Sequence, residues 1–339
     1  MLFFVGFLRN MKHFWRCLMN KTFKKITVVV QGPVQNYQER THHEEGITQR
    51  CLDSIRTHLP DSKVILSTWP DQDMTNLDYD QLIINKDPGQ NHDGFCHSNY
   101  RRQVLSTQAG LDAVTTPYAV KLRSDNFLTG NQFVTIQQQF TNTELNQKIF
   151  SEKVVVNSNL FRRSSHGHRV IMSPSDFFYY GRTDDLKLIW QQPVFNHHDF
   201  SQQLIQQAKK VAGTPFALEA EQTYCQIWLK NIAPNTTPLL KHRFDVNDDD
   251  IVTWERFLAS NIIIADPKAM GLGLRKISQR KVKRVNEYSH IDWLKLYKKY
   301  CDNTIPINID REQHQLELKR LIKLPLSKFA FKLRNRLPV

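Results

Sequence analysis

The amino-acid sequence predicts an α/β fold in which helices flank a mostly parallel sheet, followed by a basic helical extension. Strand-like and helix-like stretches alternate along the chain, and this order favours parallel strands joined by crossovers. The stretch Tyr118–Asn126 has the near-continuous apolar character of a strand covered on both faces, and it ends in charged residues. Residues 268–339 carry 18 Lys and Arg against 6 Asp and Glu, whereas residues 1–267 carry 28 against 27. The main body is therefore close to neutral and the C-terminal region is strongly basic.

Length and composition indicate an ordered protein in a reducing compartment. The 339 residues are enough for one large α/β domain with additions or for two domains, and 40% of them are hydrophobic, which supports a sizeable core. The five cysteines are far apart and show no zinc-binding spacing, so free thiols are expected. The basic C-terminal region suits an anionic surface, either membrane lipid or nucleic acid.

Residues 1–22 form an aromatic and basic N-terminal segment. Its apolar run of eight residues is shorter than the about 20 that span a bilayer, and it lacks the features of a signal peptide. Three alternatives remain open for it: an anchor at a membrane interface, a helix packed on the body, and an upstream start codon with initiation at Met11.

The first predicted strand covers residues 24–30 and ends in a turn formed by Gln31, Gly32 and Pro33. A turn of this kind at the carboxyl edge of a sheet lets the backbone approach a ligand closely. It is not the glycine fingerprint of a dinucleotide site. The next predicted elements are a helix over residues 47–59 and strands over residues 63–68 and 81–85.

A helix over residues 99–114 carries Arg101 and Arg102 in its first turn. Cations oppose the dipole there, so the pair indicates either a bound anion or two exposed surface arginines. The central strand follows and ends at Arg123, Ser124 and Asp125. A carboxylate at this edge either holds a divalent cation that binds a diphosphate or caps the next turn.

The second half of the body is predicted to hold a helix over residues 133–140, a strand over residues 152–156 and a last strand over residues 261–265. The basic loop 157–169, with His166 and His168, either contacts an anionic acceptor or is mobile. Four aromatic residues follow Asp176, among them Tyr180, and form either a platform for a sugar ring or a core strand.

Two carboxylates, Glu219 and Glu221, stand at the start of a predicted helix. They are two residues apart, so at most one of them points into a site. The alternative is that both are surface residues favoured by the helix dipole. The run Asp248–Asp250 is interpreted as a solvated loop rather than a metal site. Residues 316–337 interleave apolar and basic residues with a break at Pro325, which suits either a helix in an anionic membrane interface or a helix that covers the body.

Six ordered stretches resemble the WavE-type lipopolysaccharide synthesis proteins, a family of glycosyltransferases of bacterial surface polysaccharide. The resemblance covers about residues 24–230. The stretches are Ile26–Pro33, Thr48–Ile55, Asn85–Gly89, Asn99–Leu111, Tyr118–Asp125 and Ser175–Gly181. It implies a GT-A-like domain over residues 23–267, with a nucleotide-binding half to residue 126 and an acceptor half from residue 127. The charge count adds a basic helical region over residues 268–339.

The resemblance also places Arg123, Ser124 and Asp125 where the family has its Asp-x-Asp metal motif. Arg123 replaces the first Asp, so only Asp125 could bind Mn²⁺ or Mg²⁺ directly. Arg123 could instead neutralise phosphate itself, which puts strict metal dependence in doubt.

We therefore expect an inverting transfer of a sugar from a nucleotide-sugar donor to a lipid-linked lipopolysaccharide or capsule acceptor, at the inner face of a bacterial inner membrane. Glu221, or otherwise Glu219, is the expected general base. The residues expected to bind the donor are Gln31, Gly32, Pro33, Arg50, Arg101, Arg102, Arg123 and Ser124. Those expected to bind the acceptor are His166, His168, Asp176 and Tyr180. A nucleotidyltransferase and a non-enzymatic polyanion-binding protein are the alternatives, and no nucleic-acid partner is expected.

Overall fold

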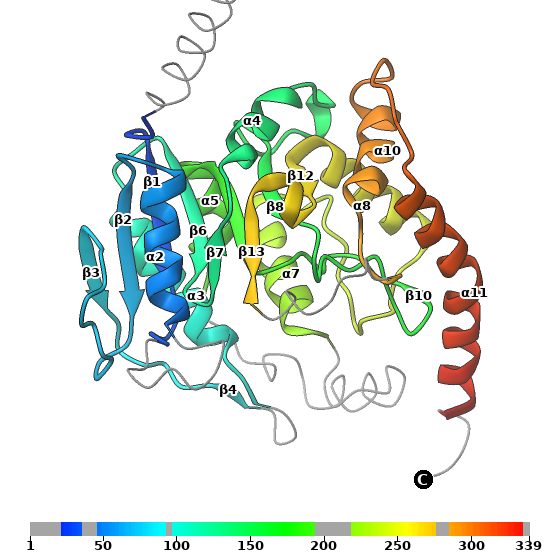
Figure 1. Cartoon of the computed structure of the whole chain (residues 1–339). Helices are drawn as coiled ribbons and strands as arrows, with labels where there is room; N and C mark the ends of the chain where they lie inside the picture. The colour runs from blue at the N-terminus through cyan, green and yellow to red at the C-terminus, as the bar shows by residue number, and fades with distance from the viewer. Residues whose placement is uncertain (1–21, 36–45, 93–96, 194–217, 276–284, 335–339) are drawn as a thin grey trace, which may run out of the picture.

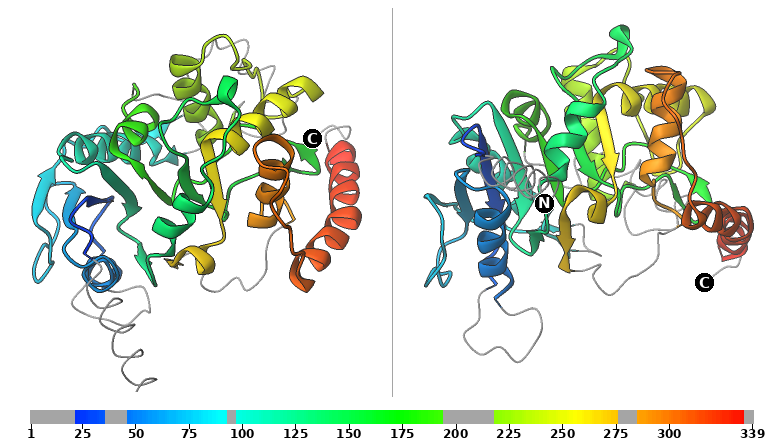
Figure 2. Two further views of the ribbon diagram at one scale, coloured as in Figure 1. Left: turned by 90° about the horizontal axis from the view of Figure 1, so that it is seen from above. Right: turned by 45° about the horizontal axis from the view of Figure 1, so that its top comes forward.

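The computed structural model describes residues 22–35, 46–92, 97–193, 218–275 and 285–334. The predicted N-terminal segment therefore lies outside the described residues, apart from residue 22. Within them the chain forms a central seven-stranded sheet with helices on both faces, which confirms the predicted mostly parallel α/β fold (Figures 1 and 2).

The central sheet has the strand order β12-β8-β11-β6-β1-β2-β3. Its strands are β1 (Ile26–Gln31), β2 (Lys63–Thr68), β3 (Gln81–Ile84), β6 (Tyr118–Arg123), β8 (Val154–Asn157), β11 (Phe178–Arg182) and β12 (Ile262–Ala265). All pairs are parallel except those of β11, which runs antiparallel to both β6 and β8. Strand β1 is buried along its whole length, as its run of apolar residues predicts.

Strands β1 and β6 mark a switch in the direction of chain growth. From β1 the chain proceeds outward through β2 and β3, then returns to place β6 on the other side of β1. The loops that leave the carboxyl ends of β1 and β6 consequently diverge. In open α/β sheets a crevice forms at such a point, and ligands bind there.

Helix α2 (Ile47–His58) covers one face of the sheet, and α3 (Tyr100–Asp112), α5 (Thr183–Trp190) and α7 (Ala220–Ile232) lie on the opposite side (Figures 1 and 2). The apolar residues of α2 recur at a spacing of four, which places Ile47, Cys51 and Ile55 on one buried stripe. Further described elements are α4 (Gln132–Gln139), η1 (Leu145–Gln147), and the short strands β4 (Asn91–His92), β5 (His97–Ser98), β9 (Ser164–Ser165) and β10 (His168–Arg169).

The C-terminal part of the chain packs against the body. The described elements here are α8 (Asp248–Asn261), α9 (Pro267–Met270), β13 (Leu272–Leu274), α10 (His290–Tyr300) and α11 (Arg311–Arg334). Strand β13 pairs antiparallel with β7 (Asn126–Leu128), directly after the central strand. Helix α11 stands at the edge of the molecule, beyond β12 and α10 (Figure 1).

Two predictions in this region are wrong. Asp248–Asp250 is not a loop but the first turn of α8. Asn247 accepts a hydrogen bond from the Asp250 amide at 2.9 Å, and Asp250 accepts one from the Asn247 amide at 3.1 Å, so the acidic run caps the helix. Pro325 does not break α11, which continues through it.

Candidate active site

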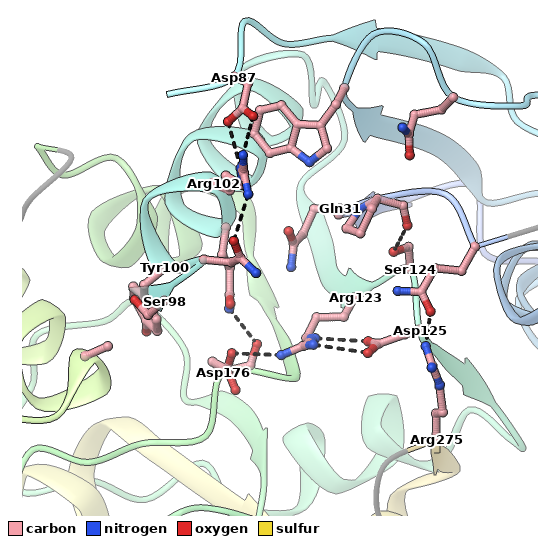
Figure 3. Close-up of a pocket in the computed structure, with 18 of the residues that line it drawn as sticks. Gln31, Asp87, Ser98, Tyr100, Arg102, Arg123, Ser124, Asp125, Asp176 and Arg275 are labelled. Carbon is pink, nitrogen blue, oxygen red and sulfur yellow. Dashed lines mark hydrogen bonds and ion pairs between the residues drawn. The ribbon is translucent and has the colours of Figure 1, made fainter. Parts of the chain in front are cut away.

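A cavity of about 870 Å³ opens where the carboxyl ends of β1, β2 and β6 meet (Figure 3). This is the crevice that the strand order predicts. Helix α3 and the start of α7 provide its other walls, through Tyr100, Arg102 and Glu221.

The turn after β1 is fixed to the turn after β6 by backbone and hydroxyl contacts. The Ser124 amide donates to the Gln31 carbonyl at 2.9 Å, and the Ser124 hydroxyl donates to the Pro33 carbonyl at 2.7 Å. Gly32 has φ +122, and an added Cβ would lie 2.9 Å from the Ser124 hydroxyl. Glycine is therefore needed there, and Ser124 positions the turn that lines the cavity.

Arg123 links two buried carboxylates at the floor of the cavity (Figure 3). Its Nε and Nη2 donate to the two oxygens of Asp125 at 3.0 and 3.1 Å. Its Nη1 donates to Asp176 at 3.2 Å. Three of the five guanidinium N–H groups are engaged in this way, so two remain for a ligand.

Asp176 keeps its charge despite burial. Burial opposes ionisation, but Arg123 and Lys121 outweigh it and hold the pKa of Asp176 below its usual value. The buried Lys121 ammonium donates to the Asp176 backbone carbonyl. Burial lowers the pKa of Lys121 to about 7.

Glu221, at the start of α7, is half-buried and lines the cavity. Burial, followed by the nearby Asp176 carboxylate, raises the pKa of Glu221 to about 7. Glu219 has a different environment, because it forms ion pairs with Arg243 at 2.7 Å and with Arg162 at 3.5 Å. The cavity walls include Glu221 and not Glu219.

The two arginines of α3 also differ. Arg102 lines the cavity and forms two hydrogen bonds with Asp87, at 2.7 and 2.5 Å, and one with Asn99 at 2.9 Å. Arg101 does not line it. The helix therefore presents only one of the two side chains to a ligand.

The cavity brings together nine of the predicted site residues, namely Gln31, Gly32, Pro33, Arg102, Arg123, Ser124, Asp125, Asp176 and Glu221. The other six do not line the cavity. They are Arg50, Arg101, His166, His168, Tyr180 and Glu219.

The positions of these residues have clear physical reasons. The Arg50 guanidinium lies over the Phe127 ring, 3.7 Å from its centroid. Tyr180 is buried in the sheet, with its ring centroid 5.0 Å from that of Phe133. His166 and His168 lie in the β9–β10 hairpin and pack against Phe331 of α11, with ring centroids 4.9 and 5.6 Å apart.

Several cavity residues were not predicted from the sequence. Trp69 follows β2 at its carboxyl end, so the rule that found Gln31 and Asp125 could have found it. Asp87 follows β3 in the same way. No local signal marks Tyr100, Gln103 or Arg275, which reach the cavity from α3 and from the residue after β13.

A resident metal ion does not fit the described residues. They contain no group of three or more His, Cys, Asp or Glu side chains that could hold a metal. Both oxygens of Asp125 are bonded to Arg123. The cavity walls carry three arginines and five acidic side chains, so the acidic groups are in excess. A diphosphate bound without a cation would add further negative charge to the cavity.

Comparison with known families identifies the chain. The family described as WavE lipopolysaccharide synthesis matches residues 26–326. The protein belongs to the WavE lipopolysaccharide synthesis family. The match extends beyond the six stretches quoted above and includes β12, β13, α10 and most of α11 of this WavE protein. None of the curated proteins compared matches the chain.

Solved structures similar to this chain have low sequence identity to it. The glycosyltransferase GlyE of Streptococcus pneumoniae has a TM-score of 0.32 and 11% identity, with 91% of this chain and 63% of GlyE covered. S. aureus TarS has a TM-score of 0.32 and 12% identity, over 89% and 80%. The 4-diphosphocytidyl-2C-methyl-D-erythritol synthase of Anaerococcus prevotii has 0.33 and 9%, over 67% and 95%.

Proposed function

We propose that this WavE protein is a nucleotide-sugar-dependent glycosyltransferase with a GT-A-like domain, and that it builds a lipopolysaccharide or related surface polysaccharide. The observation that carries the proposal is that Arg123, Arg102 and Glu221 line the same cavity, and that the pKa of the Glu221 carboxyl is raised to about 7. A phosphate leaving group needs cations, and an acceptor hydroxyl needs a base. One cavity offers both.

The donor is assigned to the wall formed by β1, β2 and α3. Trp69 and Pro33 provide apolar surface for the nucleobase, close to the Gln31–Pro33 turn. Arg102 and Arg123 each keep unused N–H groups for the phosphates, because three of five are engaged in each guanidinium.

The divalent cation enters this proposal as part of the substrate. Because the walls carry a negative excess, we infer that the donor binds as its Mg²⁺ or Mn²⁺ complex. Asp125 and Asp176 are the carboxylates that would meet the cation, through the lone pairs that their hydrogen bonds to Arg123 leave free. It would neutralise the charge that develops on the leaving phosphate.

Glu221 acts as the general base of a single displacement. Its carboxylate takes the proton of the acceptor hydroxyl, whose oxygen forms the new bond to the anomeric carbon of the donor. The bond from that carbon to the phosphate oxygen breaks, and the electron pair leaves with the nucleotide. Attack opposite the leaving group inverts the configuration, and a pKa of about 7 suits a base that works at neutral pH.

The first test measures the melting temperature of the protein with UDP, GDP, CMP and their sugar conjugates, with and without Mn²⁺. We expect one nucleotide to stabilise the protein, more strongly with Mn²⁺ and less in Asp125→Asn. Stabilisation with no Mn²⁺ effect would contradict the cation assignment, and stabilisation by none of them would contradict the donor assignment.

The second test separates the base from donor binding. Glu221→Gln should keep nucleotide binding and lower transfer to a lipopolysaccharide acceptor by about 10²- to 10⁴-fold. Glu312→Gln is the matched control, because it makes the same change at an exposed carboxylate outside the cavity. Equal losses in both variants would contradict the assignment. Release of pyrophosphate from a sugar phosphate and a nucleoside triphosphate would instead indicate a nucleotidyltransferase.

A further inference from the structure

Helix α11 is attached to the body along one side only. Gln313, Leu316 and Arg320 are buried. Arg320 donates to both oxygens of Asp292 at 2.9 and 2.7 Å and to the Glu287 carbonyl at 2.6 Å. These contacts fix which side of the helix faces the protein and which side faces away (Figures 1 and 2).

The outward side of α11 is apolar. Six of the thirteen exposed large hydrophobic residues found in the described chain lie on this helix. Five of them recur at a spacing of three or four residues and so form one stripe. They are Leu318, Ile322, Leu326, Phe329 and Leu333, with exposed fractions of 61%, 64%, 62%, 63% and 47%. At 100° per residue, this stripe is centred opposite Arg320.

Basic residues border the stripe on both sides. Lys319 and Lys323 lie along one border, and Lys328 and Lys332 lie along the other. Residues 318–334 hold six Lys and Arg and no Asp or Glu. A wide apolar stripe between two basic borders is the pattern of a helix that lies in the plane of an anionic membrane interface.

We propose that α11 docks the protein on the surface of an anionic lipid bilayer, with Leu318, Ile322 and Phe329 among the acyl chains and the flanking lysines at the lipid headgroups. None of the described helices is long and apolar enough to cross a membrane, so this contact is with the surface. A nucleic acid would pair with the lysines but has no use for the apolar stripe, whereas a bilayer engages both.

The anchoring of α11 makes this docking a property of the whole protein. Arg320 and Asp292 are both less than 10% exposed and bond each other through two hydrogen bonds, so the helix cannot turn its stripe inward without breaking them. A Cβ atom added at Gly167 would lie 2.2 Å from the Leu324 carbonyl oxygen. The β9–β10 hairpin therefore packs closely against α11. This proposal is independent of the catalytic one.

The experiment is co-sedimentation of the full chain with vesicles of phosphatidylcholine alone and of equimolar phosphatidylcholine and phosphatidylglycerol. We expect binding to the anionic vesicles that falls with salt. Lys323→Gln/Lys328→Gln should weaken it about 25-fold, at about fivefold per charge. Ile322→Ser/Phe329→Ser should weaken it at least tenfold on the same vesicles.

Two double variants serve as matched controls. Lys24→Gln/Lys25→Gln removes the same charge from exposed lysines before β1, and Leu145→Ser/Leu239→Ser removes exposed leucines elsewhere. Both should bind vesicles as the natural protein does, and all variants should keep its melting temperature. The proposal would be overturned if the α11 variants bound vesicles as well as the natural protein, or if the control variants lost as much binding as the α11 variants. A dimer in solution that Ile322→Ser/Phe329→Ser dissociates without any vesicle binding would overturn it too.

Discussion

Arg123 holds Asp125 by two parallel hydrogen bonds, Nε to Oδ1 at 3.0 Å and Nη2 to Oδ2 at 3.1 Å. Arg123 stands where the family resemblance expects the first carboxylate of a metal-binding pair. It is instead the partner of the second one, and it also bonds Asp176. The two carboxylates are 5% and 6% exposed, so this guanidinium lies between two buried acidic groups, and Lys121 adds a second positive charge near Asp176.

Arg123→Met should destabilise the protein strongly. It leaves Asp125 without its partner and Asp176 with Lys121 alone, and breaking a buried ion pair in this way costs about 3–5 kcal/mol. Asp125→Asn should cost less, because Arg123 keeps Asp176. Urea unfolding of the three proteins at neutral pH measures the difference. In the absence of nucleotide, Mn²⁺ should restabilise Arg123→Met but not the natural protein. Equal stability of Arg123→Met and Asp125→Asn would refute the conclusion that Arg123 stabilises both carboxylates.

Glu221 should govern the pH dependence of transfer. Its pKa is raised from 4.5 to about 7, so the base form is lost as pH falls below about 7. We expect kcat/KM to rise about tenfold per pH unit below that value and to level above it. A flat profile between pH about 5 and 8 would rule out Glu221 as the base.

The raised pKa of Glu221 also makes the stability of the protein depend on pH. Its contribution to stability falls as pH rises, whereas the activity rises. Between its usual pKa of 4.5 and about 7, Glu221 binds more protons in the folded than in the unfolded protein. Its contribution is therefore fully present below pH 4.5 and lost as pH rises through about 7. Glu221→Gln has no such loss. As pH rises across this window, the melting temperature of Glu221→Gln should increase relative to that of the natural protein. A difference that does not change with pH would contradict the raised pKa of Glu221.

The strands of the sheet could be predicted because each is marked by a short run of apolar residues within its own stretch of sequence. Apolar runs located β1, β2, β6 and β12, and the residues at their carboxyl ends, Gln31 and Asp125, proved to share one cavity. The antiparallel direction of β11 could not be predicted, since a buried strand has the same apolar run in either direction. The first turn of α8 was open to prediction, because Asn247 followed three residues later by Asp250 resembles a capping box.

The site was only half predictable, because choosing between neighbours needs the rotation of a helix. Arg101 and Arg102 are equivalent in the sequence, as are Glu219 and Glu221. Each helix turns only one of the pair toward the cavity. The hairpin with His166 reads as a polar loop because its partner, Phe331, lies far along the chain.

Arg102→Gln should weaken nucleotide binding, because a charged hydrogen bond to phosphate contributes about 1.5–3 kcal/mol, or about 10- to 100-fold. Arg101→Gln is the matched control on the same turn of α3 and should bind nucleotide normally. Calorimetric titration with the nucleotide found in the thermal-shift test gives both affinities. The parent nucleoside, which has no phosphate, should bind the two variants equally. A larger loss in Arg101→Gln would show that the donor uses a different wall.

Gly167→Ala tests how closely the β9–β10 hairpin approaches α11. Gly167 has φ +77, and an added Cβ would lie 2.2 Å from the Leu324 carbonyl oxygen and 2.6 Å from the Lys328 amide nitrogen. These are backbone atoms, so no rotamer change relieves the clash. Gly89 is the matched control, because it has φ +76 and no atom within 4 Å of an added Cβ. Gly89→Ala should cost only the strain of the left-handed conformation, about 1–2 kcal/mol. Gly167→Ala should cost about 1–3 kcal/mol more, and equal losses in urea unfolding would show that the hairpin does not bear on the helix.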